Sequence, residues 1–206
     1  MEIINLLDKE YGGLGCALVY ETPFELLIAT MLSAQTTDIT VNKATTVLFQ
    51  KYNKPEEFAV LELSELEGYI KTCGFYKTKG IHIIDTSKKL ITEFGGEVPR
   101  TIEELTSLPG VGRKTANVVM SNAFGIAAIA VDTHVFRVSN RIGLANSNSV
   151  EDTEKQLMEK IPKDYWSSTH HLLIWHGRRI CTARKPKCEH CSIANLCRFY
   201  INQISN

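Results

Sequence analysis

Apolar residues recur along most of this chain at intervals of three and four, the spacing that places side chains on one face of an α-helix. Two runs with this spacing are Val41, Ala44, Thr45, Leu48, Phe49 and Tyr52, and, further on, Glu154, Leu157, Met158 and Ile161. No alternating segment is long enough for a sheet, and residues 127–131 are the one short strand candidate. The pattern therefore predicts an all-α fold.

Helix boundaries carry local signals that agree with this fold class. A serine or threonine followed three residues later by glutamate forms a capping box, in which each side chain accepts a hydrogen bond from the other residue's backbone. The candidates are Thr22 with Glu25, Ser64 with Glu67, and Thr101 with Glu104, and stop signals lie at Gly95-Gly96, Gly143 and Asn146–Asn148. Because no Pro-, Ser- or Gly-rich linker divides the chain, any second domain must arise from helix packing.

The composition permits a large core but points to no partner. With 206 residues, 44% of them hydrophobic, the chain can form one large domain or two modest ones. Its formal net charge is zero, so any surface that binds nucleic acid must be local. Met1 is followed by Glu2, and the apolar run at 126–131 is too short for a signal core or a membrane span. A soluble, cytoplasmic protein is expected.

The segment LPGVGRKTA at 108–116 joins two helical patterns and is a helix-hairpin-helix candidate. Gly110 and Gly112 permit backbone angles closed to other residues and leave the N–H groups of the next helix open to a phosphate. Arg113 adds positive charge at the same helix start. The alternative is an ordinary interhelical turn that needs glycine only for its geometry.

Lys114 would lie in the first turn of that second helix. The helix dipole and neighbouring Arg113 both disfavour a protonated amine there, which makes the neutral nucleophile of imine chemistry easier to reach. The alternative is a lysine that pairs with a phosphate or is simply solvated.

Asp132 follows the apolar run and precedes Thr133-His134-Val135, so its carboxylate can cap the next helix. A carboxylate at such a sheltered entrance can also stabilise the oxocarbenium-like state through which deoxyribose loses a base. The alternative is an N-cap with no catalytic role. An ionised Asp132 near Lys114 would raise the pKa of the lysine unless it took the lysine's proton, and the sequence leaves that balance open.

Four cysteines near the C-terminal end follow the spacing C-x6-C-x2-C-x5-C: Cys181, Cys188, Cys191 and Cys197. Four-cysteine zinc sites usually contain two C-x2-C pairs, and only one occurs here, which favours a 4Fe-4S cluster over zinc. Cys16 and Cys73 are expected to be lone buried thiols.

Basic residues surround the first of these cysteines and supply the local patch that the net charge conceals. Arg184, Lys185 and Lys187 lie between Cys181 and Cys188, and Arg178-Arg179 precedes them. Such a loop suits backbone phosphates, although a solvated basic loop is the plain alternative.

Taken together, LPGVGRKTAN, AVDTHVFRVSNR and the cysteine spacing resemble the endonuclease III family of DNA repair enzymes over nearly the whole chain. The resemblance implies a monomeric, bifunctional pyrimidine glycosylase and abasic-site lyase that acts on damaged double-stranded DNA in a bacterial or archaeal-type cell, associated with its nucleoid. It implies a six-helix, barrel-like domain at 20–128 with the helix-hairpin-helix at about 101–124. Residues 1–19 and 129–206 would form a second helical domain with the cluster loop at 181–197.

The resemblance also implies individual roles. Lys114 becomes the Schiff-base nucleophile that leads to β-elimination on the 3′ side, Asp132 the catalytic carboxylate, and the four cysteines the ligands of a 4Fe-4S cluster. Gln35, within LSAQTTD, would fill the gap left by the extruded nucleotide, and Phe75 stands where the family usually has a wedge leucine. Related members that remove adenine or mismatched thymine replace the lysine, so its presence here favours the lyase. A non-catalytic DNA-binding module and a redox or metal sensor are the rival functions.

Overall fold

The computed structural model describes residues 1–205, and this part of the chain contains helices and no strands, which confirms the all-α prediction. Residues 127–131, the strand candidate, have no regular secondary structure. The chain divides into two compact units, Cys16–Gly125 and Met1–Gly15 with Ile126–Asn206. Each unit has its own hydrophobic core. No helix within 1–205 combines the length and apolar character needed to cross a membrane.

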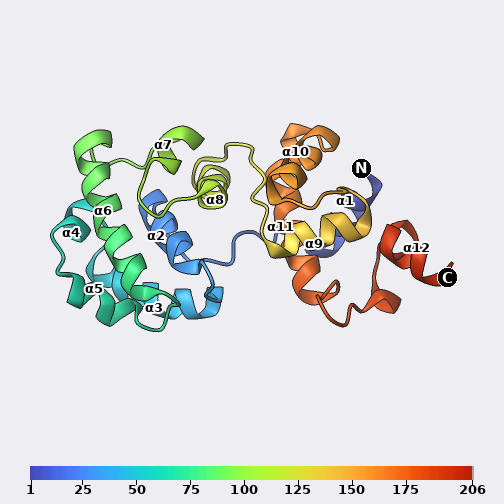
Figure 1. The fold of residues 1–206 in the computed structure, drawn as a ribbon, viewed down its shortest axis with the longest axis horizontal. Coiled ribbons are helices and arrows are strands. Elements are labelled where there is room, and N and C mark those ends of the chain that lie inside the picture. The colour runs from blue at the N-terminus through green and yellow to red at the C-terminus, as the bar shows by residue number, and fades with distance from the viewer. Residues whose placement is uncertain (206) are drawn as a thin grey trace. The chain divides into compact units, whose positions relative to one another are not determined.

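The unit Cys16–Gly125 is built around one helix that is buried on nearly every side. Its helices are α2 (Pro23–Ser33), α3 (Asp38–Lys51), α4 (Pro55–Ala59), α5 (Leu63–Ile70), α6 (Tyr76–Phe94), α7 (Ile102–Thr106) and α8 (Arg113–Phe124) (Figure 1). Every residue of α2 from Phe24 to Leu32 is buried, and the helix packs against α3, α6 and α8. A helix that is apolar all round requires such complete cover.

The second unit combines a helix from the start of the chain with the C-terminal third. Its helices are α1 (Glu2–Tyr11), α9 (Thr133–Ile142), α10 (Val150–Lys160), α11 (Trp166–Arg179) and α12 (Arg198–Ile204), with short 3₁₀ turns at Lys163–Tyr165, Cys188–His190 and Ala194–Leu196 (Figure 1). Helix α11 packs against both α1 and α9. The N-terminal residues therefore complete a core made mostly of sequence that follows residue 125.

At two of the three predicted capping boxes only the threonine cap forms, because the Glu25 carboxylate accepts from the Glu21 N–H and the Glu104 carboxylate accepts from the Thr101 hydroxyl. The third prediction is wrong. The Glu25 N–H donates to Thr22 Oγ1 at 3.1 Å, and the Glu104 N–H donates to Thr101 Oγ1 at 3.3 Å. Helix α5, however, begins at Leu63, one residue before Ser64. The reason is that the Glu62 carbonyl already accepts the first helical hydrogen bonds, so Ser64 lies inside the first turn.

A half-buried histidine makes the second unit sensitive to acid. His171 of α11 lies largely out of solvent, and this burial lowers its pKa from 6.5 to about 4. Between these two values the unfolded chain binds a proton that the folded chain does not bind. The free energy of unfolding therefore falls as the pH falls from about 6.5 toward 4.

Substituting His171 tests this linkage. In His171→Gln, the loss of unfolding free energy between pH 7 and pH 5 should be smaller than in the unsubstituted protein by about 1–2 kcal/mol, measured by urea unfolding. Between pH 7 and pH 8 the two proteins should show the same pH dependence, which serves as the control. Identical acid sensitivity at pH 5 would contradict the assignment, since all other titratable groups are shared.

Candidate functional site

The segment Ser107–Gly112 links α7 to α8 and forms the turn predicted for a helix-hairpin-helix. Gly110 has a φ of +73°, a left-handed conformation that side chains disfavour. A Cβ atom at this position would also lie 2.7 Å from His82 Nδ1. Glycine is therefore required at position 110 for two independent reasons.

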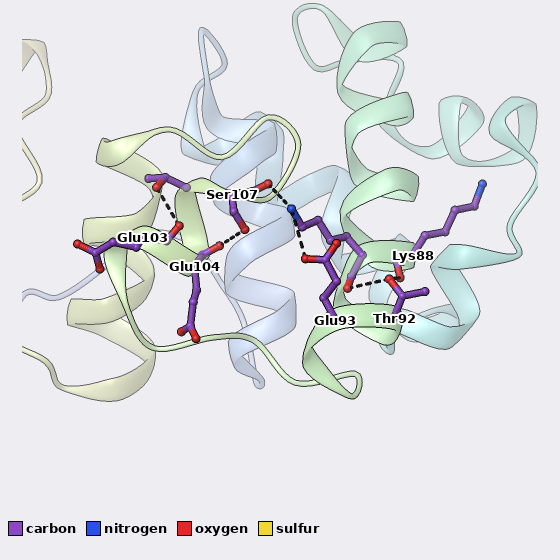
Figure 2. Close-up of polar contacts among 8 residues, drawn as sticks. Lys88, Thr92, Glu93, Glu103, Glu104 and Ser107 are labelled. Carbon is purple, nitrogen blue, oxygen red and sulfur yellow. Dashed lines mark hydrogen bonds and ion pairs between the residues drawn. The ribbon is translucent and has the colours of Figure 1, made fainter.

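Two side chains of helix α6 donate hydrogen bonds to the backbone of this turn. Thr86 Oγ1 donates to the Pro109 carbonyl at 2.8 Å, and Lys89 Nζ donates to the Ser107 carbonyl at 2.9 Å. Lys89 is also 3.6 Å from a carboxylate oxygen of Glu93, one turn further along α6. Figure 2 shows Glu93 and Ser107 on the facing segments. These bonds fix the backbone of the turn without occupying the face at the start of α8.

Helix α8 begins with no side-chain cap. Its N-cap is Gly112, so no side chain bonds to the first-turn N–H groups, and those groups with the helix dipole favour an anion. Arg113 and Lys114 are both exposed in this turn. The side chain of Lys114 has no hydrogen bond or ion pair within its own unit, and its amine is exposed to a ligand.

Gln35 and Phe75 lie on two adjoining loops of the same unit. Both side chains are exposed, and Phe75 retains 66% of its accessible surface. The Gly74 N–H donates to Thr36 Oγ1 at 3.0 Å, which joins the loop after α2 to the loop before α6. The two predicted wedge residues thus lie on two loops that are joined by a hydrogen bond.

Asp132 belongs to the second unit, and the prediction that it caps a helix is confirmed. Its Oδ1 accepts hydrogen bonds from the N–H groups of His134 and Val135, each at 2.8 Å, at the start of α9. No donor among the described residues of its own unit bonds to its other oxygen, Oδ2. Burial lowers the pKa of His134, with the Asp132 carboxylate opposing this shift, so the ring beside the carboxylate is uncharged near neutral pH.

The four C-terminal cysteines surround one cavity, whose surface is almost entirely apolar. Cys181, Cys188, Cys191 and Cys197 line it together with Ile142, His176, Ile180, Pro186, Ala194, Phe199 and Tyr200. All four are free thiols. In the described residues no group of three or more His, Cys, Asp or Glu side chains is arranged to hold a single metal ion. The thiols thus border a shared space.

The chemistry of these thiols fits a cluster that carries positive charge. Burial, and then the neighbouring cysteines, raise the pKa of Cys188. Burial also raises the pKa of Cys191 to about 11. Four thiolates in an apolar pocket repel one another and lack solvation, so they need cations between them. Iron supplies that charge, and thiolate is its usual ligand in iron-sulfur clusters.

An arginine from α9 fastens the loop that bears these cysteines. Arg141 donates to the carbonyls of Thr182 and Ala183, each at 2.8 Å, and its Nη1 lies 3.5 Å from Cys181 Sγ. Its guanidinium also lies over the ring of Phe199, 4.9 Å from the centroid. Sequence reasoning missed Arg141, although it stands four residues after Arg137 on one face of α9.

Other contacts support the same loop. Arg137, one turn earlier on α9, donates to the Cys181 carbonyl at 3.2 Å. His176 Nε2 lies 3.6 Å from Cys191 Sγ, and its Nδ1 lies 3.2 Å from the hydroxyl of Tyr11. Burial lowers the pKa of His176, so the ring is neutral and one nitrogen accepts while the other donates. Helix α1 is thereby connected to the cysteine pocket.

The basic residues of this loop face solvent. Arg184, Lys185 and Lys187 are exposed and form no ion pair with any residue in the described chain. The preceding Arg178 and Arg179 both lie over the ring of Trp175, at 5.4 and 5.0 Å from its centroid. The exposed side chains of Arg184, Lys185 and Lys187, on a loop that Arg141 and Arg137 hold in place, are suited to phosphate contacts.

Replacing each hairpin glycine tests the geometry of the turn. Gly110→Ala should lower the free energy of unfolding by about 1–3 kcal/mol, because it places a Cβ at a positive φ against His82. Gly112→Ala is the matched control, since its φ is −91° and no atom lies within 4 Å of the added Cβ. Urea unfolding measures both. Equal losses in the two variants would contradict the account of this turn.

Comparison with known proteins identifies the family. The model of the HhH-GPD superfamily base excision DNA repair protein matches residues 28–163, and that of the iron-sulfur binding domain of endonuclease III matches residues 181–197. Endonuclease III of Bacillus subtilis is 54% identical over 184 residues, which is 89% of this chain and 84% of the relative.

Two solved structures are also similar to the chain. A trapped endonuclease III–DNA covalent intermediate has a TM-score of 0.93 and 48% identity, over 98% of this chain and 95% of the other. A non-covalent endonuclease III–DNA complex has a TM-score of 0.94 and 48% identity, over 100% of this chain and 96% of the other. These matches confirm the resemblance read from the sequence: the chain belongs to the endonuclease III family of the HhH-GPD base excision DNA repair superfamily.

Proposed function

We propose that this protein removes oxidised pyrimidines from duplex DNA and then cleaves the abasic site, acting as both a DNA glycosylase and a lyase. The observation that carries the proposal is the exposed Lys114 at the uncapped start of α8, in a chain whose relative has been trapped as a covalent intermediate with DNA. A trapped intermediate requires a protein nucleophile, and a lysine amine is the usual one in imine chemistry.

Lys114 carries the covalent steps. Its amine attacks C1′ of the damaged nucleotide, the bond to the base breaks, and the base leaves with the electron pair. Loss of the amine proton and ring opening give an imine between Nζ and C1′. The imine acidifies the C2′ proton, and its removal expels the 3′ phosphate, which breaks the strand. Water then hydrolyses the imine and releases the lysine.

Asp132 stabilises the positive charge that develops on the sugar. Its Oδ1 is held by two backbone N–H groups, so the carboxylate has a fixed orientation. The oxygen Oδ2 remains for the oxocarbenium-like carbon, as carboxylates act in glycoside hydrolysis. The cap thus fixes the orientation of the group that carries out the chemistry.

The remaining residues bind and deform the duplex. Phosphate binds the N–H groups after Gly110 and Gly112 with the help of Arg113, and the basic loop binds the backbone through Arg184, Lys185 and Lys187. Gln35 and Phe75 fill the space that the extruded nucleotide leaves. Extrusion costs a few kcal/mol, and less for a poorly stacked lesion.

The family's 4Fe-4S cluster is assigned to Cys181, Cys188, Cys191 and Cys197. When bound, the cluster is a scaffold that neutralises the thiolates and orders the basic loop between Cys181 and Cys188. The protein acts as a monomer, because one chain supplies the nucleophile, the carboxylate and the basic loop. Its place is the bacterial cytoplasm, at the nucleoid where its substrate lies.

Two substitutions test the catalytic roles. Lys114→Gln should still bind damaged duplex but give no covalent adduct on borohydride reduction, because no imine can form. Asp132→Asn should slow base release by on the order of 10²–10⁴ while leaving the fold intact, measured by single-turnover kinetics and circular dichroism. Near-normal strand cleavage in either variant would overturn the role given to that residue.

The same assay separates the rival functions. A DNA-binding module would bind duplex with strong salt dependence and release no base even with Lys114 intact. A redox or metal sensor would exchange its cluster readily and would not turn over damaged DNA. Adduct formation by the unsubstituted, cluster-loaded protein therefore excludes both rivals as its main function.

Removing the arginine that fastens the cysteine loop should destabilise the cluster. Arg141→Met loses two hydrogen bonds to loop carbonyls and one contact to Cys181 Sγ, each worth about 1–3 kcal/mol when the donor is charged. We expect faster loss of the cluster's visible absorbance in the presence of an iron chelator. Arg184→Met, which removes an exposed arginine of the same loop, is the control and should lose iron at the original rate. Equal rates in the two variants would contradict the role of Arg141.

A further inference from the structure

Gln35 and Phe75 share an unusual backbone conformation. They are the two non-glycine residues in the described part of the chain with positive φ, at 53° and 57°. A left-handed conformation costs of order 1–3 kcal/mol in a residue other than glycine and persists only where the surroundings enforce it. Neither side chain supplies that enforcement, because both are exposed. Some other group must hold the two loops.

Lys79 is in contact with the first of these loops. It lies in the first turn of α6 and keeps only 8% of its accessible surface. Its Nζ donates to the carbonyls of Leu32 at 2.7 Å and Ala34 at 2.6 Å, and to Thr36 Oγ1 at 3.3 Å. An ammonium group has three N–H donors, so all of them are used within the protein.

The charge of this lysine is compensated by the end of a helix and by no acidic side chain. The described residues include no ion-pair partner for Lys79, and burial lowers its pKa. The Leu32 carbonyl is in the last turn of α2, and Ala34 is the C-cap. These carbonyls carry the negative end of the α2 dipole, which favours a cation. Because α2 has no glycine at its end, Lys79 takes the place of the usual cap.

Thr36 passes this restraint to the second loop. Its hydroxyl oxygen accepts from Lys79 Nζ and also from the Gly74 N–H at 3.0 Å. A Cβ atom at Gly74 would lie 3.1 Å from the Gln35 carbonyl oxygen, so the two backbones are in close contact. Gly74 directly precedes Phe75. A single ammonium group therefore binds the Ala34 carbonyl and the Thr36 hydroxyl, on either side of Gln35, and is connected through that hydroxyl to the residue before Phe75.

We propose that Lys79 is a positioning residue that holds Gln35 and Phe75 in their left-handed conformations, ready to enter the duplex. The inference rests on the proposed function, because it takes these two residues as the wedges. Contact of Lys79 with a DNA phosphate does not account for the geometry, since the group is buried and its donors are occupied. Rigid wedges reduce the cost of extruding a paired nucleotide, whereas a nucleotide that is already unpaired gains nothing from them.

Lys79→Met tests this role, because it keeps the length of the side chain and removes the charge and the donors. We expect base release from an oxidised pyrimidine in duplex DNA to fall by on the order of tenfold or more. Cleavage at an abasic site in single-stranded DNA should change less than about twofold, since no gap needs filling there. A 2-aminopurine opposite the lesion should also show a smaller fluorescence rise on binding, which reports wedge insertion independently of catalysis.

Matched variants separate positioning from a general loss of structure. Lys88→Met removes an exposed lysine from the same helix and should leave both activities and the fluorescence change unaltered. Lys79→Arg keeps the charge and the donors and should restore part of the duplex activity. If Lys79→Met does not fold, Thr36→Val replaces it, and Thr36→Ser, which keeps the shared hydroxyl, is its control.

The outcomes test the role of Lys79 separately from the proposed function. Selective loss on the duplex supports the inference. Equal loss on both substrates, or no loss on either, overturns it, as does an unchanged 2-aminopurine signal in a folded Lys79→Met. If the unsubstituted protein itself fails to release the base from the duplex, the proposed function is wrong, and this result is distinct from any difference between variants.

Discussion

A helix end leaves backbone N–H or C=O groups without partners, and the way this chain satisfies those groups determines where its functional residues lie. At the start of α8 the cap is Gly112, so the N–H groups stay available to a phosphate. At the start of α9 the side chain of Asp132 accepts hydrogen bonds from the N–H groups, and these bonds orient its carboxylate. At the end of α2 the carbonyl groups are bound by Lys79, which fixes the adjoining loop. Three helix ends in this chain are thus satisfied in three different ways.

The parts predicted from the sequence are those governed by local chemistry. Helical spacing, the caps at Thr22 and Asp132, and the left-handed glycine at position 110 depend on residues a few positions apart, and each is present in the structure. Gly112, which was expected to need the same freedom, has an ordinary φ of −91°. The cap at Ser64 was wrong because the helix already begins at Leu63, with Glu62 as its N-cap. Lys79 and Arg141 were missed for a different reason: the partners of both side chains lie 40 or more residues away along the chain, and no local pattern reports such contacts.

The cysteine pocket combines two opposed requirements. Apolar walls exclude water from the thiols but raise the pKa of Cys188 and Cys191, so the pocket alone disfavours the thiolates that iron needs. The surrounding donors, Arg141 near Cys181 and His176 near Cys191, place positive or polar groups beside the sulfur atoms. Iron binding and loop folding are consequently coupled, and the basic surface between Cys181 and Cys188 depends on both.

The connectivity of the two units has a consequence for synthesis on the ribosome. Cys16–Gly125 is continuous in sequence, so all the residues of its core emerge together and can pack early. The other unit joins Met1–Gly15 to residues after Gly125. The hydrogen bond between the Tyr11 hydroxyl and His176 therefore cannot form until 165 further residues have been made. During that interval the apolar face of α1 lacks the residues that cover it in the folded unit, so this helix needs protection from aggregation until they are made.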